Sequence, residues 1–280
     1  MLYNARNLAL KIDGVNMDCA VFGKGNKPLV MIPGLSTRGV KGSALPLAHM
    51  YRIFARDYRV YVFDRKAVIP DEYTVEDIAE DVAKGMSALG ISSADVFGVS
   101  QGGMIAQYLA INHPELVRKL VLGLTLSREN ETVRSVVENW IRMAEAGDYR
   151  AFVLDMFEKM YSESYVRRYR WLFPILSRLG KPRDGARFVR LAKACLTCDT
   201  YDELYRIQCP TLVLGARRDQ VVTGEASEEI AKRLGCAIYM YDDLGHAAYE
   251  EAKDFNKRVL DYLMDGPHPK ERTEKRRDLK

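Results

Sequence analysis

Cysteine and histidine are both scarce in this 280-residue chain, which has five of the first and four of the second. Cys195 and Cys198 form one C-x-x-C pair, but no second pair stands at the spacing of a structural zinc site. The cysteines therefore predict neither a zinc site nor a disulfide framework, and we interpret the pair as a structural feature of a helix. We expect no metal ion and no organic cofactor.

Long apolar runs are absent as well. No stretch reaches the length of a transmembrane helix, and the first residues lack the apolar core of a secretory signal. From these absences we expect a cytoplasmic protein with no integral membrane segment. We expect it to be a monomer or homodimer.

The chain also lacks a strong excess of one charge, since 42 Lys and Arg residues face 38 Asp and Glu residues. Because no recognition motif accompanies the small net charge, no nucleic-acid partner is expected. One segment is locally basic. We interpret it as a solvated helical face, with an anionic substrate or a membrane surface as the alternative. Its basic residues are Arg167, Arg168, Arg170, Arg178, Lys181, Arg183, Arg187, Arg190 and Lys193.

Short apolar runs separated by helical patterns are what the chain does contain. Runs typical of buried strands cover 28–32, 60–63, 94–97, 120–122 and 211–214, and residues 75–82 carry apolar side chains at helical spacing. The alternation predicts an α/β protein with a mostly parallel central sheet, helices on both faces and ligands at the carboxyl edge of the strands. Asp13-Gly14, between two strand-like segments, predicts an antiparallel hairpin at the sheet's edge.

Residues 127–205 break this alternation, because they contain no strand-like run but show helical patterns near 133–144, 149–160, 165–176 and 186–196. We therefore divide the chain into a core of 1–126 and 206–265, a helical cap of 127–205 and a polar, mobile tail of 266–280. Large apolar side chains of the cap are candidates for a pocket wall, although most should form the cap's own core. They are Trp140, Met143, Phe152, Met156, Phe157, Tyr161, Trp171 and Phe173.

One serine is flanked by glycine two residues away on each side, in Gly98-Val99-Ser100-Gln101-Gly102. Between a strand-like and a helical run, this is the pattern of a strand-to-helix nucleophile turn. A β-carbon at either glycine would collide with a neighbouring element, and Ser100 would be held in a strained conformation with its hydroxyl exposed. The Gln101 amide would lie at the helix N-terminus, where anions are stabilised. An ordinary glycine-rich turn is the alternative.

Activation of a serine hydroxyl needs a base. His246 follows the strand-like residues 237–241 and precedes the last helix, so it is placed at the carboxyl end of a strand. The other histidines are placed less well, since His49 lies on a helix, His113 at a helix end and His268 in the tail. His246 is therefore the predicted base.

The acid is inferred in the same way. Asp219 follows the strand-like residues 211–215, and its alternative role is to cap the helix that begins near residue 225. Asp64, Asp242 and Asp243 are rivals, of which the last two resemble turn residues. We choose Asp219, because a triad must converge in space and proximity to His246 in sequence is a poor guide.

Several further motifs occur in the order typical of one family: Met31-Ile32-Pro33-Gly34-Leu35, Phe63-Asp64-Arg65, His113-Pro114-Glu115 and Cys209-Pro210-Thr211-Leu212-Val213. With the serine motif, they make the chain resemble a single-domain α/β-hydrolase-fold protein over nearly all of residues 1–265. The resemblance implies the triad order Ser100, Asp219, His246 and an oxyanion hole formed by the backbone amides of Leu35 and Gln101. Pro33 departs from the family, which usually has histidine there.

The resemblance and the motifs together predict a serine hydrolase of the carboxylesterase type. It would cleave a carboxylic ester or a related small acyl substrate through an acyl-enzyme intermediate. Aminopeptidase, thioesterase, carbon–carbon bond hydrolase and perhydrolase activities share the triad and remain alternatives. A ligand-sensing protein that keeps the fold without turnover is another. We expect the inner face of the cap to set substrate preference and the sheet loops to carry the chemistry.

Overall fold

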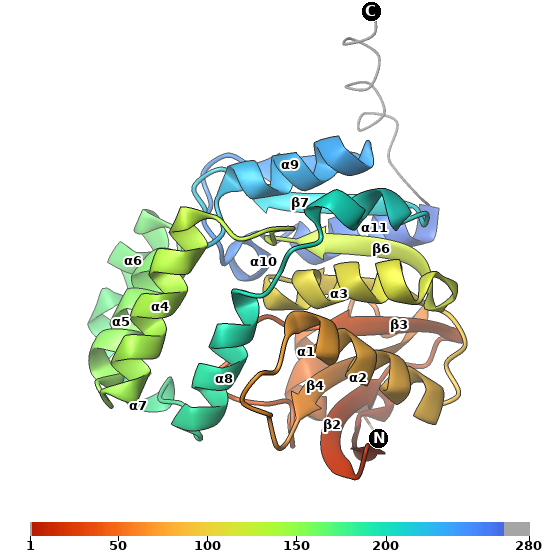
Figure 1. Ribbon diagram of the computed structural model, residues 1–280, viewed down its shortest axis with the longest axis horizontal. Coiled ribbons are helices and arrows are strands. Elements are labelled where there is room, and N and C mark those ends of the chain that lie inside the picture. Colours follow the sequence, from red (N-terminus) through yellow and green to blue (C-terminus); the bar gives the residue numbers. More distant parts are fainter. Residues whose placement is uncertain (1, 266–280) are drawn as a thin grey trace, which may run out of the picture.

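Eight strands form one sheet in the computed structural model, which describes residues 2–265 (Figure 1). The strand order is β1-β2-β4-β3-β5-β6-β7-β8. The strands are β1 (Arg6–Ile12), β2 (Val15–Phe22), β3 (Lys27–Ile32), β4 (Tyr58–Lys66), β5 (Ala94–Val99), β6 (Val117–Gly123), β7 (Thr211–Ala216) and β8 (Ala237–Tyr241). From β4 to β8 the neighbours pair in parallel, which confirms the predicted α/β class and mostly parallel sheet.

The predicted hairpin is also confirmed. Strands β1 and β2 pair antiparallel, and β1 is an edge strand. Asp13 and Gly14 connect them with φ angles of 49° and 81°, the positive values that a tight two-residue hairpin turn requires. The predicted tail, residues 266–280, lies outside the described residues.

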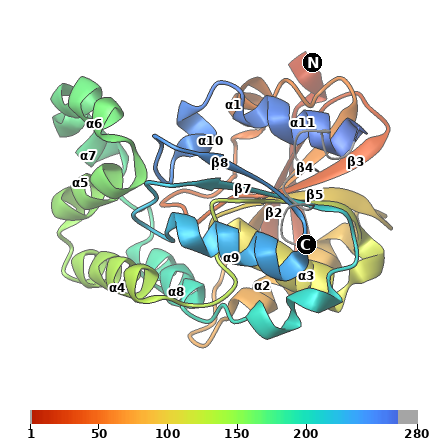
Figure 2. The same cartoon turned by 90° about the horizontal axis from the view of Figure 1, so that it is seen from above.

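Helices cover both faces of the sheet (Figure 2). Helices α2 (Val75–Ala88), α3 (Gln101–Asn112) and α9 (Gly224–Leu234) pack on one face, and α1 (Ala44–Met50) and α11 (Phe255–Asp265) pack on the other. Short α10 (Ala248–Glu251) precedes α11. Parallel strands buried on both faces need the near-continuous apolar sequences that this chain has, and the residues of β5 and β7 are all buried.

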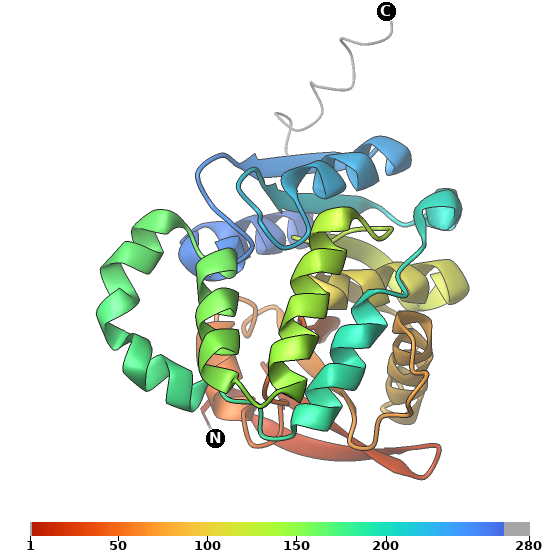
Figure 3. The ribbon, with the colours of Figure 1, turned by 60° about the vertical axis from the view of Figure 1, so that its left-hand side comes forward.

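Five α-helices lie between β6 and β7 in the chain, beyond one edge of the sheet (Figure 3). They are α4 (Glu131–Glu145), α5 (Tyr149–Met160), α6 (Glu163–Tyr169), α7 (Phe173–Leu179) and α8 (Gly185–Cys195). Side chains that accept a hydrogen bond from a first-turn amide begin four of them: Asn130, Asp148, Ser162 and Asp184. We refer to α4–α8 as the cap.

The predicted helix over 165–176 is wrong in one respect, because two α-helices and a 3₁₀ turn, Arg170–Leu172, occupy this region. Pro174 explains the break. Proline has no amide hydrogen, and its ring clashes with the carbonyl group four residues earlier, so it is tolerated only in the first turn of a new helix. It is the second residue of α7.

Candidate active site

Ser100 lies at the sharp turn between β5 and α3. Its φ and ψ angles are 54° and −124°, a conformation that side-chain-bearing residues rarely adopt. The flanking glycines make the turn possible: a β-carbon on Gly98 would lie 2.2 Å from the Gly102 carbonyl oxygen, and one on Gly102 would lie 1.8 Å from the Ile32 carbonyl oxygen. The backbone of Ser100 is held by its own amide, which donates to the Gly123 carbonyl at 2.9 Å.

The structure brings Ser100, His246 and Asp219 together. Ser100 Oγ lies 2.9 Å from His246 Nε2, and His246 Nδ1 lies 2.8 Å from Asp219 Oδ2. An ionised carboxylate only accepts, so Nδ1 of the imidazole carries the hydrogen that binds Asp219. In the neutral imidazole, Nε2 is then left to accept the serine proton. The arrangement is that of a nucleophile, a base and an orienting acid.

Asp219 is held rigidly on the loop after β7. Its second oxygen, Oδ1, accepts hydrogen bonds from the amides of Val221 at 2.8 Å and Val222 at 3.0 Å. Both Asp219 and His246 are buried, with 7% and 3% of their surfaces exposed. Low exposure strengthens the attraction between an imidazolium and this carboxylate, because little water screens it.

The rival acids lie elsewhere. Asp242 and Asp243 are exposed and bind arginines of the loop after β7. Asp64 accepts from the Val40 amide at 2.9 Å and from Arg187 of α8 at 3.2 Å. None of the three bonds to His246 in the part of the chain described, where the imidazole's bonds go to Asp219 and Ser100.

The other histidines are not at this site. His49 is an exposed residue of α1. His113, just after α3, binds the Glu80 carboxylate at 2.9 Å. His268 lies outside the described residues.

Two backbone amides adjoin the serine where the oxyanion hole is expected. Gln101 begins α3, so its amide lies at the positive end of that helix. Leu35 lies on the loop after β3, and the neighbouring Gly34 is so close that a β-carbon there would lie 3.7 Å from Ser100 Oγ. Between residues 2 and 265, neither amide donates to a protein acceptor. Both are therefore available to a developing oxyanion.

Arg65 supports this loop, and sequence reasoning gave it no role. Its side chain is buried, and Nη2 donates to the Pro33 carbonyl at 2.6 Å and to Gln101 Oε1 at 2.9 Å. Burial lowers the pKa of Arg65. The Gln101 amide group in turn donates to the Leu191 carbonyl of α8 at 2.6 Å. Arg65 thus connects the loop before Leu35, the turn that carries Ser100 and the cap. A charged residue within a buried strand was the available signal.

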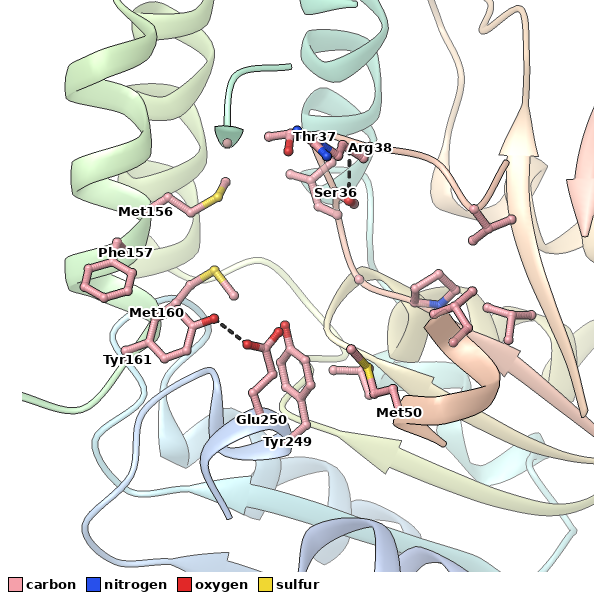
Figure 4. A pocket seen from close by; sticks show the side chains of 18 of the residues that line it. Ser36, Thr37, Arg38, Met50, Met156, Phe157, Met160, Tyr161, Tyr249 and Glu250 are labelled. Carbon is pink, nitrogen blue, oxygen red and sulfur yellow. Dashed lines mark hydrogen bonds between the residues drawn. The ribbon is translucent and has the colours of Figure 1, made fainter. Parts of the chain in front are cut away.

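A small cavity adjoins Ser100 and His246, and a large cavity lies beside the small one. The small one, about 30 Å³, is lined by Ser100, His246 and apolar residues, and the large one, about 760 Å³, opens beside it (Figure 4). Gly34, Leu35 and residues of the cap line both. A volume of this size suits a small organic ligand.

The candidate pocket residues of the cap divide into three groups. Met156 lines both cavities, Trp140 lines the small one, and Phe157 and Tyr161 line the large one. Phe152 belongs to the buried core, Met143 packs against that core, and Phe173 is buried elsewhere in the cap. Trp171 forms the third group, because it is 74% exposed and is neither a cavity nor a core residue.

Cys195 is the cysteine nearest the serine, since it lines the small cavity. Burial raises its pKa to about 12, so it is a neutral thiol near pH 7. Gln101 Nε2 lies 3.1 Å from its sulfur. Within the described residues, no group of three or more His, Cys, Asp or Glu side chains could hold a metal ion. Nor, over the same residues, is any helix long and apolar enough to cross a membrane.

The chain is similar to known proteins of one family. A profile of the family described as alpha/beta hydrolase fold matches residues 27–253. A Serratia proteamaculans protein named as a carbamate hydrolase, RutD, is 30% identical, with 74% of this chain and 81% of that protein covered. A protein of Mycobacterium phage D29 named as a non-heme haloperoxidase is 29% identical, with 82% and 84% covered. The crystal structure of MGS-M2, an alpha/beta hydrolase enzyme from a deep-sea metagenome library, superposes with a TM-score of 0.82 at 19% identity, covering 93% and 98%.

Proposed function

Because this chain belongs to the α/β hydrolase fold family, we propose that it is a serine hydrolase that cleaves a carboxylic ester or a related small acyl compound. The observation that carries the proposal is the hydrogen-bonded series Ser100–His246–Asp219 on a strained turn beside a cavity. A structural serine would need neither the strain nor a buried imidazole aimed at its hydroxyl.

Acylation uses each group in turn. Ser100 Oγ attacks the substrate carbonyl as His246 Nε2 takes its proton, and the carbonyl oxygen becomes an oxyanion held by the Leu35 and Gln101 amides. The bond between the carbonyl carbon and the leaving group then breaks, and the leaving group takes the proton from His246. Asp219 stabilises the imidazolium between these steps.

Deacylation repeats the sequence with water. His246 takes a proton from a water molecule that attacks the acyl carbon, and the Ser100 ester bond breaks as the serine oxygen takes that proton back. The products are a carboxylic acid and free enzyme. No metal ion or organic cofactor takes part in this scheme.

A second candidate is perhydrolysis, which the haloperoxidase name of the phage relative favours. In that reaction hydrogen peroxide replaces water as the acyl acceptor, so the acyl-enzyme releases a peracid. The triad serves both reactions, and the acceptor is the difference between them.

The test begins with a fluorophosphonate probe. We expect covalent labelling of Ser100 in the native protein, and loss of labelling with an unchanged melting temperature in Ser100→Ala. A panel of p-nitrophenyl esters, aminoacyl amides, thioesters, and esters with added peroxide then identifies the reaction. A label mapped to another residue would refute the nucleophile, whereas labelling without turnover of any substrate would favour a ligand-sensing role.

A further inference from the structure

An exposed carboxylate beside aromatic side chains lies at one end of the large cavity. Glu250, on α10, comes four residues after His246, and its side chain lines the cavity beside Tyr249 (Figure 4). The hydroxyl group of Tyr161, from the end of the cap helix α5, donates to Glu250 Oε2. The carboxylate thus lies where the cap meets the segment that carries the catalytic histidine.

Glu250 has no basic partner among residues 2–265. Every ion pair found there joins other residues, so the negative charge is not neutralised by a lysine, arginine or histidine. Burial and Glu250 together raise the pKa of Tyr51 to about 12, and burial first and Glu250 second raise that of Tyr161. Near pH 7 these phenols are neutral, so they add no charge to this end of the cavity.

Aromatic rings of the cap form an ordered stack beside this charge. The Tyr161 and Tyr165 rings are stacked, with centroids 4.5 Å apart and planes 13° from parallel. Phe157 packs on Tyr161 at 4.9 Å and Tyr169 packs on Tyr165 at 4.4 Å. All four rings line the large cavity. Ring faces and a carboxylate both attract cations, and an apolar wall favours a cation with a weakly hydrated, alkylated surface.

We propose that the Glu250 end of the large cavity binds an alkylammonium group, quaternary or protonated, carried by the substrate. The proposal rests on the proposed function only in naming this group as part of the substrate, since the binding itself needs no turnover. Arg38 lines another part of the cavity, on the loop that also carries Ser36 and Thr37 (Figure 4). Its positive charge disfavours a cation there and so directs the ammonium group toward Glu250.

Choline and 3,3-dimethylbutan-1-ol test the proposal, because they have the same shape but only choline is charged. Their binding is measured by calorimetry on Ser100→Ala, which removes the reaction from the experiment. We expect choline to bind about 10-fold more tightly than the neutral alcohol, a ratio in the range of cation–aromatic and charge contributions. Equal affinities would overturn the proposal, whatever the enzyme's activity.

Variants locate the site. In Ser100→Ala/Glu250→Gln the preference for choline should fall to about 1, because the amide removes the charge but its oxygen still accepts from Tyr161. In the matched Ser100→Ala/Arg38→Gln protein the preference should persist or increase. An unchanged preference in the Glu250 variant would overturn the assignment. If that variant does not fold, Tyr165→Leu in the Ser100→Ala background serves instead, with a reduced preference expected and an unchanged one contradicting the site.

The same comparison extends to turnover. With the active enzyme, kcat/KM for acetylthiocholine should exceed that for 3,3-dimethylbutyl thioacetate by about 10-fold, and Glu250→Gln should abolish the difference. Turnover of both thioesters at one rate, with no preference in binding, would reject the ammonium site while supporting the serine hydrolase. Loss of turnover with the binding preference intact would do the opposite.

Discussion

Replacing Asp219 with asparagine should impair catalysis by reversing the tautomer of His246. Asp219 Oδ1 accepts from two backbone amides, those of Val221 and Val222, and Oδ2 faces His246 Nδ1. In Asp219→Asn, only the amide oxygen can accept from the two backbone groups, so the NH₂ group must face the imidazole. Nδ1 then has to accept, and the ring hydrogen moves to Nε2, which can no longer take the serine proton.

The expected loss follows from this geometry. In serine triads, a wrong imidazole tautomer with otherwise intact positions lowers kcat by a factor of about 10⁴. At 1.36 kcal/mol for each factor of ten, this raises the activation free energy by roughly 5.4 kcal/mol. The backbone contacts of the side chain survive, so the melting temperature should change little. Binding in the large cavity should also persist, because Asp219 does not line it.

The assay is hydrolysis of a p-nitrophenyl ester, with the rate of fluorophosphonate labelling as a second readout of the nucleophile. Asp242→Asn and Asp243→Asn are the matched controls, since each removes one charge from an exposed carboxylate nearby in sequence. Their kcat should stay within a few-fold of wild type, because exposed ion pairs contribute little. Wild-type kcat in Asp219→Asn, or a large loss in either control, would refute the reasoning.

Three further perturbations test the structure. Burial raises the pKa of the Cys195 thiol to about 12, so its thiolate fraction at pH 8 should be only about 10⁻⁴. We therefore expect DTNB to modify Cys195 in guanidinium and not in the native protein. Rapid reaction of Cys195 in the native protein would contradict its burial. Gly102→Ala should prevent correct folding of the turn at Ser100, because the new β-carbon would collide with a carbonyl group. Gly90→Ala has open space at its β-carbon and is strained only by a positive φ, so it should lower the free energy of unfolding in urea by about 1 kcal/mol. Similar effects of the two substitutions would argue against the predicted collision. Phe152→Ala should destabilise the protein by about 3–5 kcal/mol without changing the order of preference among esters of different chain length. Met156→Ala should change that order, with kcat/KM values shifting within roughly two decades. The reverse pattern would exchange the roles of the two residues.

Local chemistry explains why much of the fold could be predicted. Strands buried on both faces need a continuous apolar sequence, so β5 and β7 could be predicted. A two-residue hairpin needs residues that accept a positive φ, so the Asp13-Gly14 turn could be predicted as well. The break between α6 and α7 could not be predicted in this way. The periodicity of the apolar residues continues through it, and only the missing amide hydrogen shows where one helix must end.

The candidate site was predicted to the extent that its residues follow strands. Ser100, Asp219 and His246 each follow a strand in a parallel region of the sheet, so their meeting at one edge follows from topology. The contacts of Arg65 could not be predicted. They join residues 32 and 36 positions away in sequence, and which carbonyl or amide a buried guanidinium reaches depends on packing that no spacing encodes.

Contacts between the cap and the loops that carry Ser100 and His246 argue that the cap affects more than substrate preference. At the end of α5, the Met160 carbonyl accepts from the Ala247 amide at 2.7 Å, next to His246. The following Ser162 donates through Oγ to Glu251 at 2.6 Å. On the other side, α8 accepts a hydrogen bond from Gln101.

The cap therefore contacts both loops whose separation sets the distance from Ser100 Oγ to His246 Nε2. Displacing the end of α5 would move the backbone beside His246, and displacing α8 would remove a partner of the residue that follows the nucleophile. Because reacting groups must be placed within a fraction of an ångström, such shifts reduce kcat as well as change KM. Side chains that line the cavity, such as Met156, are not part of these hydrogen bonds. Preference and rate should thus separate within the cap according to whether a substitution changes a cavity wall or one of these anchoring hydrogen bonds.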